Sequence, residues 1–406
     1  MITGVRQVGK TYSIRASGKQ SFNSFIEVNF LENIPARTLF ENAKNSKDLL
    51  LRLSALVDSP LIPGKTLIFF DEVQECKEIV TAIKFLVEEG SFRYILSGSL
   101  LGVDLKDIRS IPVGYMDIIE MYPLDFEEFA LANQVSSTVL EALRKSFTDK
   151  VAVDPVIHEK MMDLFRLYLI VGGMPVAVQT YLSTNNLKEV MREQRSILSL
   201  YKKDIANYDS ENKLYLEDIF DLIPSELNSK NKRFILKKLN ENFKYSRYAN
   251  SFLWLKDAGV ALPTFCVKEP TVPLLLSKCS NLFKLFLCDV GLLSSMYMDN
   301  IQLKSLIKKK TSILVLFMRM LLLRNSRRMV LTFIISTVKN KERLIFSLRE
   351  KEQSSRLKSS QAKNSQNIRR WIIYCQFQIM LFQKLSYFTM TMSDKMERSC
   401  IIPCIC

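Results

Sequence analysis

The first residues with the types and spacing needed for chemistry lie at the start of the chain. Residues 4–11, GVRQVGKT, fit the pattern G-x-x-x-x-G-K-[ST] of a phosphate-binding loop, the Walker A motif. In such a loop the backbone N–H groups point toward phosphate oxygens, the lysine reaches the β- and γ-phosphates, and the threonine hydroxyl ligates Mg²⁺. The predicted cofactor-binding residues are Gly4, Gln7, Gly9, Lys10 and Thr11. The expected cofactors are ATP and Mg²⁺.

A pair of acids, Asp71 and Glu72, follows the apolar run 67–70. In a parallel sheet, an acid at the carboxyl end of a buried strand lies beside the phosphate-binding loop. Asp71 is therefore expected to hold Mg²⁺ through water, and Glu72 to orient or deprotonate the attacking water. Without the loop, the pair would equally fit surface acids at a strand end. With the loop, Lys10 and Glu72 are the candidate catalytic residues.

A third polar group follows the next β-rich run, in the sequence LSGSLLG. A serine at this strand end, Ser99 or Ser97, is a candidate sensor that contacts the γ-phosphate or the attacking water; a capped turn before a helix is the alternative. No arginine finger is assigned. Arg93, Arg109 and Arg166 are candidates, and another subunit can also supply one.

Three β-rich runs and one helical run supply the elements that must position these residues. Residues 24–30, 67–74 and 92–99 are predicted strands. Between the last two, residues 77–90 have apolar positions at helical spacing and end in Gly90, a helix stop signal. This β–α–β order predicts an α/β fold, a parallel sheet with helices on its faces, and together with the phosphate-binding loop it indicates a P-loop NTPase.

The chain divides into four predicted parts. Residues 1–135 form the P-loop core, whose first strand is expected to be largely missing because only Met1, Ile2 and Thr3 precede the loop. Residues 136–209 are predicted to be a helical lid or linker region. Residues 210–300 contain helical patterns followed by short extended segments, which suits a winged-helix-like domain. Residues 301–406 form a basic and irregular tail.

Seven stretches, in order along the chain, resemble a family of prokaryotic AAA-type ATPases with a C-terminal domain of unknown function. They are GVRQVGKTY, LIFFDEVQ, YILSGSLLGV, PVGYMDIIEMYPLDFEEF, VGGMPVAV, YKKDI and FKLFLCDVGLL. The resemblance implies an AAA-like core, a winged-helix segment and then a nuclease-like α/β domain. It also carries the roles described above to Lys10, Thr11, Asp71 and Glu72. The family's cellular role is poorly defined.

The net charge of +15 belongs to the tail. Residues 1–300 carry 36 Lys and Arg against 37 Asp and Glu, whereas residues 301–406 carry 21 against 5. The last glycine is Gly291, although a folded segment of this length normally needs glycine for turns. His158 is the single histidine and the cysteines lack zinc-site spacing, which argues against histidine-based catalysis and zinc.

We hypothesise that the chain from about residue 305 onward is a frameshift product. Lys308, Lys309 and Lys310 imply an A-rich run in the gene, where insertions and deletions are common. A shifted frame through residues 310–363 permits codons that restore glycines and acids. It also permits the acid…E-x-K pattern of the nuclease-like domain in the family named above. On this hypothesis the basic tail is not evidence for nucleic-acid binding.

Three functions fit the sequence. The first is Mg²⁺-dependent ATP hydrolysis. The second is nucleic-acid binding through the winged-helix segment and the basic cluster with Lys237 and Lys238, for which a solvated helix face is the plainer interpretation. The third is an inactive product of a damaged gene. Expected partners are a nucleotide and a second copy or another protein. Without a signal peptide or an apolar membrane span, we expect a cytoplasmic protein.

Overall fold

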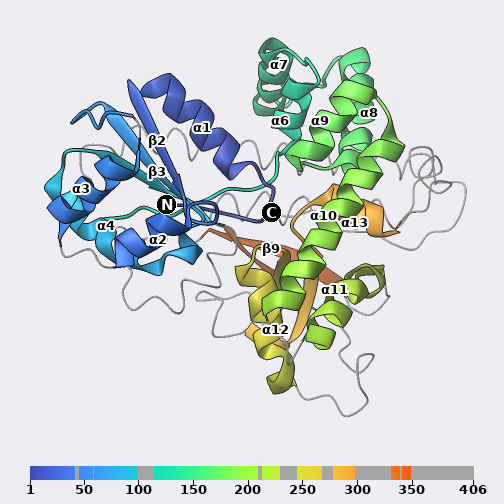
Figure 1. Ribbon diagram of the computed structural model, residues 1–406. Coiled ribbons are helices and arrows are strands. Elements are labelled where there is room, and N and C mark those ends of the chain that lie inside the picture. Colours follow the sequence, from blue (N-terminus) through green and yellow to red (C-terminus); the bar gives the residue numbers. More distant parts are fainter. Residues whose placement is uncertain are drawn as a thin grey trace, which may run out of the picture.

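A computed structural model describes nine segments of the chain (Figure 1). They are residues 1–41, 45–57, 59–98, 114–208, 213–228, 245–267, 278–297, 331–338 and 341–348. Figure 1 shows an N-terminal sheet with its helices beside a mostly helical region, with further strands below.

The N-terminal sheet is parallel, as predicted. Its strands are β1 (Ile2–Thr3), β2 (Ser24–Asn29), β3 (Thr66–Asp71), β4 (Arg93–Leu96) and β5 (Ile119–Glu120). The order β2-β3-β4 is hydrogen-bonded throughout in parallel. Strand β1 pairs in parallel with β5, and Ile2 forms a parallel bridge to Ser97, one residue past β4. The short β1 therefore lies between β4 and β5.

Helices cover both faces of this sheet. They are α1 (Lys10–Ser21), α2 (Ile34–Glu41), α3 (Ser46–Leu56) and α4 (Lys77–Glu89), with a 3₁₀ turn at Val73–Glu75. On one face Gly18 of α1 lies against Phe25 and Leu67, where a Cβ would come within 2.4 Å of the Phe25 ring. On the other face Ile68 and Phe70 join the core formed with α2, α3 and α4. Alternate residues of β3 thus serve opposite faces, which explains why the whole strand is buried and apolar.

A helical region follows the sheet. It contains α6 (Phe126–Ala132), α7 (Ser137–Thr148), α8 (Pro155–Val171), α9 (Pro175–Thr184), α10 (Leu187–Tyr208), α11 (Lys213–Asn228) and α12 (Tyr245–Asp257). Helix α6 begins with a capping box in which Asp125 and Glu128 exchange hydrogen bonds with each other's backbone. Helices α7 to α10 match the helical pattern predicted for residues 136–209.

A second sheet follows α12. Strands β6 (Ala261–Val267) and β7 (Lys278–Leu287) pair antiparallel, and helix α13 (Val290–Tyr297) comes next. One helical pattern of the predicted winged-helix-like domain, residues 231–242, lies outside the described residues. The winged-helix assignment and the four domain boundaries therefore stay predictions.

Within the tail that was predicted to be irregular, the structure describes one regular element. Strands β8 (Leu331–Val338) and β9 (Lys341–Leu348) form an antiparallel hairpin, and β8 extends the second sheet by pairing in parallel with β6. The rest of residues 301–406 lies outside the described segments.

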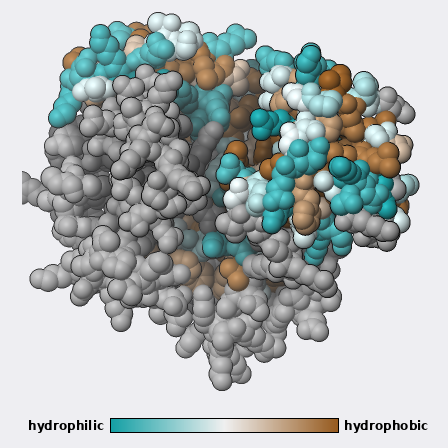
Figure 2. Space-filling model, turned by 90° about the vertical axis from the view of Figure 1, so that its left-hand side faces the viewer, coloured by the Kyte–Doolittle hydropathy of each residue, from teal (hydrophilic) through white to brown (hydrophobic). Residues whose placement is uncertain are grey.

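In Figure 2, hydrophilic side chains (teal) and apolar side chains (brown) are interspersed over the described part of the face shown. Among the helices described, none is long and apolar enough to cross a membrane.

Most of the buried apolar side chains in the described segments form two clusters. One lies within the N-terminal sheet and its helices α2, α3 and α4. The other joins the helical region to β6, β7 and α13, and it also contains Val5 and Val8 of the predicted phosphate-binding loop. The apolar side chains of the loop therefore pack in the core of the helical region. They do not pack in the core of the N-terminal sheet, although the loop connects β1 of that sheet to α1.

Candidate nucleotide-binding site

The loop of residues 4–11 leaves the short strand β1 and leads directly into α1. A Cβ at Gly4 would lie 2.3 Å from the Met121 carbonyl oxygen, so only glycine fits there. Gly9 is the N-cap of α1 at φ 95°, and no side chain caps the first turn of that helix. Gln7 also has a positive φ, 64°. Because the first N–H groups of α1 are uncapped, the helix start can receive an anion.

Lys10 is folded back onto the loop. Its ammonium group donates to the carbonyl oxygens of Gly4, at 2.9 Å, and Val5, at 3.1 Å. Burial lowers the pKa of Lys10 to about 8, although the nearby Glu72 and Asp71 carboxylates raise it. An ammonium group has three donors, so one is left for a ligand.

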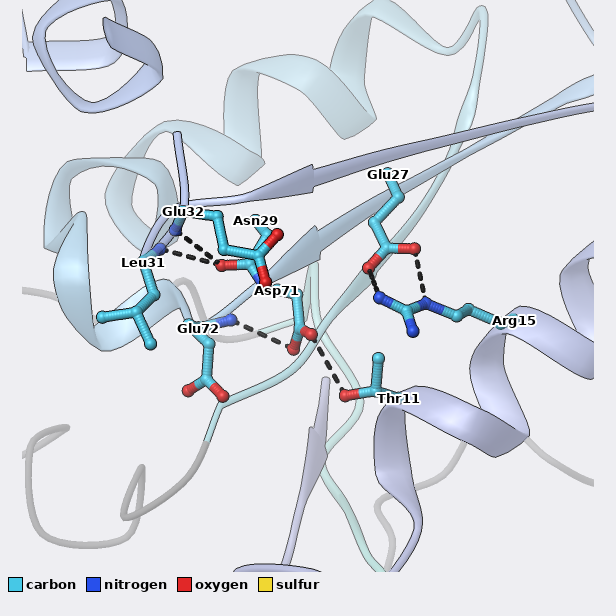
Figure 3. Close-up of polar contacts among 8 residues, drawn as sticks. All are labelled: Thr11, Arg15, Glu27, Asn29, Leu31, Glu32, Asp71 and Glu72. Atoms are coloured by element: carbon cyan, nitrogen blue, oxygen red, sulfur yellow. Dashed lines mark hydrogen bonds and ion pairs between the residues drawn. The ribbon is translucent and has the colours of Figure 1, made fainter. Parts of the chain in front are cut away.

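Thr11 and Asp71 meet although they lie 60 residues apart (Figure 3). The Thr11 hydroxyl donates to Asp71 Oδ2 at 3.0 Å, and the Glu72 backbone N–H donates to Asp71 Oδ1 at 3.1 Å. Asp71 ends the buried strand β3, and burial, followed by the Glu72 charge, raises its pKa. The structure thus brings together the two side chains predicted to hold Mg²⁺.

Glu72 has a left-handed backbone, with φ 54° and ψ 48°. This conformation is uncommon for a residue other than glycine and recurs at functional sites. Its carboxylate accepts a hydrogen bond from the Gln74 amide at 2.5 Å. The strand end therefore turns sharply at Glu72, and Gln74 fixes the side chain beside Asp71. Sequence reasoning did not identify Gln74.

The residues at this edge suit a nucleotide with Mg²⁺. A threonine hydroxyl and one carboxylate are oxygen ligands of the kind that Mg²⁺ takes together with substrate phosphates. Two buried polar atoms, Ser97 Oγ and Gln74 Oε1, have no hydrogen-bond partner within the described segments. Those segments also contain no group of three or more His, Cys, Asp or Glu side chains that could form a closed metal site.

A neighbouring network orders the end of β2 (Figure 3). Arg15 of α1 donates to both carboxylate oxygens of Glu27, at 2.7 and 2.6 Å. Asn29, the residue that pairs with Asp71 across the strands, accepts hydrogen bonds from the backbone of Leu31 and Glu32. This network ties α1 to the sheet next to the Thr11–Asp71 contact.

The other predicted residues are placed as follows. Ser97 is fully buried and bridges to β1, whereas Ser99 and Arg109 lie outside the described residues. Arg93 begins β4 and therefore lies at the strand end opposite the site. Arg166 forms an ion pair with Asp163 on its own helix. The structure places neither of these two described arginines at the loop.

Three sequence stretches that carried the resemblance meet in one buried junction. The Asp289 carboxylate accepts from the Gly173 N–H at 2.7 Å and from the Gly291 N–H at 2.9 Å. The Gly173 carbonyl accepts from the Leu124 N–H at 2.7 Å, and the Tyr168 hydroxyl donates to the Leu124 carbonyl at 2.7 Å. These stretches, YPLDF, VGGMP and CDVGL, therefore have a structural role at the junction.

Helix α10 also contacts the loop, through residues of the stretch YKKDI. The Tyr201 hydroxyl donates to the Arg6 carbonyl oxygen at 3.1 Å, and the Arg6 guanidinium forms an ion pair with Asp204. The sequence showed this stretch only as part of a resemblance. Nothing in its residue types indicated a contact with a loop nearly two hundred residues earlier.

Comparison with known proteins agrees with this fold. A family model described as an AAA domain matches residues 1–130, and a model of a domain of unknown function (DUF8612) matches residues 162–305. No match was found among curated proteins. The N-terminal part of the chain has the fold of a P-loop AAA-type ATPase, as the sequence predicted.

Two solved structures share low similarity with the chain. The Orc1 protein of Aeropyrum pernix, solved in complex with DNA, is 13% identical, with 75% of this chain and 85% of that chain covered and a TM-score of 0.27. Cdc6p of Pyrobaculum aerophilum is 11% identical, with 76% and 86% covered and a TM-score of 0.24. Similarity at this level carries no argument about what this chain binds.

Proposed function

We propose that this chain binds ATP with Mg²⁺ and hydrolyses it to ADP and phosphate. The observation that carries the proposal is the hydrogen bond from Thr11 to Asp71, because it joins the phosphate-binding loop to the acid at the strand end. A Walker A loop, an uncapped helix start and a buried acid are the parts that phosphoryl transfer from a nucleotide requires.

Each residue has a distinct task in this proposal. The loop backbone and Lys10 bind the phosphates, and Thr11 and Asp71 are the residues that would hold Mg²⁺. If bound there, Mg²⁺ would supply positive charge that offsets the charge of the phosphates. Glu72 orients the attacking water or takes its proton, and the hydrogen bond from Gln74 at 2.5 Å holds the Glu72 carboxylate in place. Ser97 and Ser99 stay candidate sensors.

Phosphate release from ATP by the full chain tests this proposal. Lys10→Ala should abolish both ATP binding and hydrolysis. Glu72→Gln should abolish hydrolysis but retain binding, because the amide keeps the shape and loses the basic carboxylate. Lys19→Ala, in the last turn of α1, and Glu78→Gln, in the first turn of α4, are the matched controls and should behave like the wild type. Failure to bind ATP at millimolar concentration would overturn the proposal.

We propose that a second copy or another protein supplies an arginine finger, since neither Arg93 nor Arg166, the two candidates among the described residues, lies at the loop. Light scattering with and without Mg²⁺ and ATP measures whether the nucleotide drives assembly. We expect a larger mass with the triphosphate than with ADP.

Nucleic-acid binding stays the alternative prediction. The basic cluster around Lys237 and most of the tail lie outside the described residues. Salt-dependent DNA binding that survives deletion of residues 301–406 would favour this alternative.

We also propose that residues from about 305 onward result from a shifted reading frame, and that the nuclease-like domain belongs in their place. In that case the chain is the product of a damaged gene. Sequencing the gene decides this: if neither shifted frame reads through, the proposal is wrong.

A further inference from the structure

We propose that helix α10 completes the nucleotide site, with Tyr201 and Asp204 as positioning residues that hold the phosphate-binding loop in its binding shape. This inference rests on the proposed function of the loop, and it gives a task to the region matched by the domain of unknown function.

The contact between Tyr201 and the loop is specific. Tyr201 is almost completely buried, and its hydroxyl donates to the Arg6 backbone carbonyl at 3.1 Å. This burial raises the pKa of Tyr201 well above its ordinary value, so the hydroxyl keeps its proton and stays a donor. Arg6 precedes Gln7, whose φ of 64° marks the bend of the loop. Tyr201 thus fixes the backbone at the point where the loop turns.

Asp204 lies one helical turn after Tyr201. Tyr201 binds the backbone of Arg6, and Asp204 binds its side chain. Its carboxylate pairs with the Arg6 guanidinium; the Asp204 side chain is 10% exposed and that of Arg6 is 42% exposed. Burial is the main cause that lowers the pKa of Lys10 and raises that of Asp204; the Arg6 charge adds to the first shift and the Glu72 charge to the second. Arg6 and Asp204 therefore share one electrostatic environment with the candidate catalytic residues.

Apolar packing supports the same contact from two further directions. Val5 and Val8 lie in the core of the helical region and are 3% and 1% exposed. The turn before β6 approaches so closely that a Cβ at Gly259 would lie 3.4 Å from the Val5 nitrogen. Strand β1, on the other side, contributes only two residues. The loop therefore receives much of its support from the helical region.

Tyr201→Phe tests this proposal with the smallest change. The loop carbonyl loses its donor, so the dissociation constant of ATP should rise roughly five- to tenfold, the usual effect of one lost hydrogen bond. The kcat of the saturated enzyme should change little, because Tyr201 touches no reacting group. Tyr297→Phe is the matched control, since it removes a hydroxyl that donates to the Pro224 carbonyl within the same region, away from the loop. It should leave ATP affinity within about twofold.

Asp204→Asn tests the side-chain contact. ATP affinity should fall roughly tenfold, the usual range for a charge-assisted hydrogen bond. In an Arg6→Ala background the same change should have no further effect, because Asp204 acts through Arg6. Asp221→Asn, which breaks the ion pair with Lys202 at 2.7 Å, is the matched control and should leave affinity unchanged.

Amide hydrogen exchange of residues 4–9 without nucleotide separates this proposal from the proposed function. Tyr201→Phe and Asp204→Asn should speed exchange in the loop, and the two control variants should not. Unchanged exchange together with unchanged ATP affinity in both variants would overturn the positioning role and leave the proposed function standing. A wild-type chain that binds no ATP would overturn the proposed function, and the loop exchange would still decide whether α10 positions the loop.

Discussion

At the scale of single residues, Lys10 shows how the site balances burial against charge. Its ammonium group is 7% exposed and is satisfied by two loop carbonyls, with Asp71 and Glu72 nearby. Burial is the larger effect and leaves the pKa at about 8. A phosphate ligand favours the protonated form, so binding and protonation of Lys10 are coupled.

We therefore predict that ATP affinity falls as the pH rises through about 8. At about pH 9 the dissociation constant should be roughly tenfold higher than at about pH 7, because only protonated Lys10 binds phosphate well. Titration calorimetry across this range measures the change. A Lys10→Arg variant keeps its charge, so its weaker affinity should stay constant over the same range. A flat profile for the wild type would contradict the prediction.

The lowered pKa of Lys10 also determines how its contribution to folding stability changes with pH. The pKa of Lys10 lies below its ordinary value of 10.5 in the folded chain, so the folded state binds fewer protons than the unfolded state between about 8 and 10.5. The contribution of Lys10 to the stability of the nucleotide-free chain thus rises with pH across that interval.

At the scale of elements, the junction between α8, α9 and α13 fixes the base of the loop. Gly173 lies between α8 and α9, and a Cβ there would come within 2.0 Å of the Leu124 carbonyl oxygen. Pro175, which begins α9, lies 3.5 Å from the position of a Cβ on Gly9. The junction therefore lies next to the end of the loop.

Gly173→Ala should lower the free energy of unfolding by about 3 kcal/mol, because the backbone of Leu124 must move to admit the methyl group. Urea unfolding followed by circular dichroism measures this. Gly64→Ala is the control: Gly64 has a φ of +73° but open space around it, so only the backbone penalty of about 1 kcal/mol applies. Equal losses in the two variants would contradict the role given to the junction.

The sequence was sufficient to predict the elements of the nucleotide site but not their support. The strand and the loop of the site could be identified because their chemistry depends on local residue order. The strand is Leu67–Phe70, followed by Asp71 and Glu72, and the loop contains Lys10 and Thr11. The contacts of Tyr201 and Asp204 depend on how two distant segments pack, and residue types alone do not show this. Gln74 was missed because an amide beside an acid has no distinctive spacing.

At the scale of the whole molecule, the phosphate-binding loop of the AAA-type part packs into the core of the helical region, while the sheet keeps a core of its own. Val5 and Val8 contribute to the core of the helical region from the loop, and Gly259 and α10 contact the loop from the other side. Figure 1 shows the blue segment that leads into α1 extending toward the green helices. The loop is thus built from both parts of the chain.

Residues 1–135 expressed alone should therefore bind ATP at least roughly tenfold more weakly than the full chain, because the loop loses its hydrogen bonds and apolar contacts. Circular dichroism would establish that the segment is folded before nucleotide titration. A folded segment with the affinity of the full chain would contradict the support that the loop receives from the helical region.

Equilibrium binding of ATP to the full chain, with and without Mg²⁺, tests the central claim most directly. We predict saturable binding to the wild type that Mg²⁺ strengthens, binding that Asp71→Asn makes insensitive to Mg²⁺, and no binding to Lys10→Ala. Equal affinity of the wild type and Lys10→Ala, or no saturable binding to the wild type at millimolar ATP, would contradict the account.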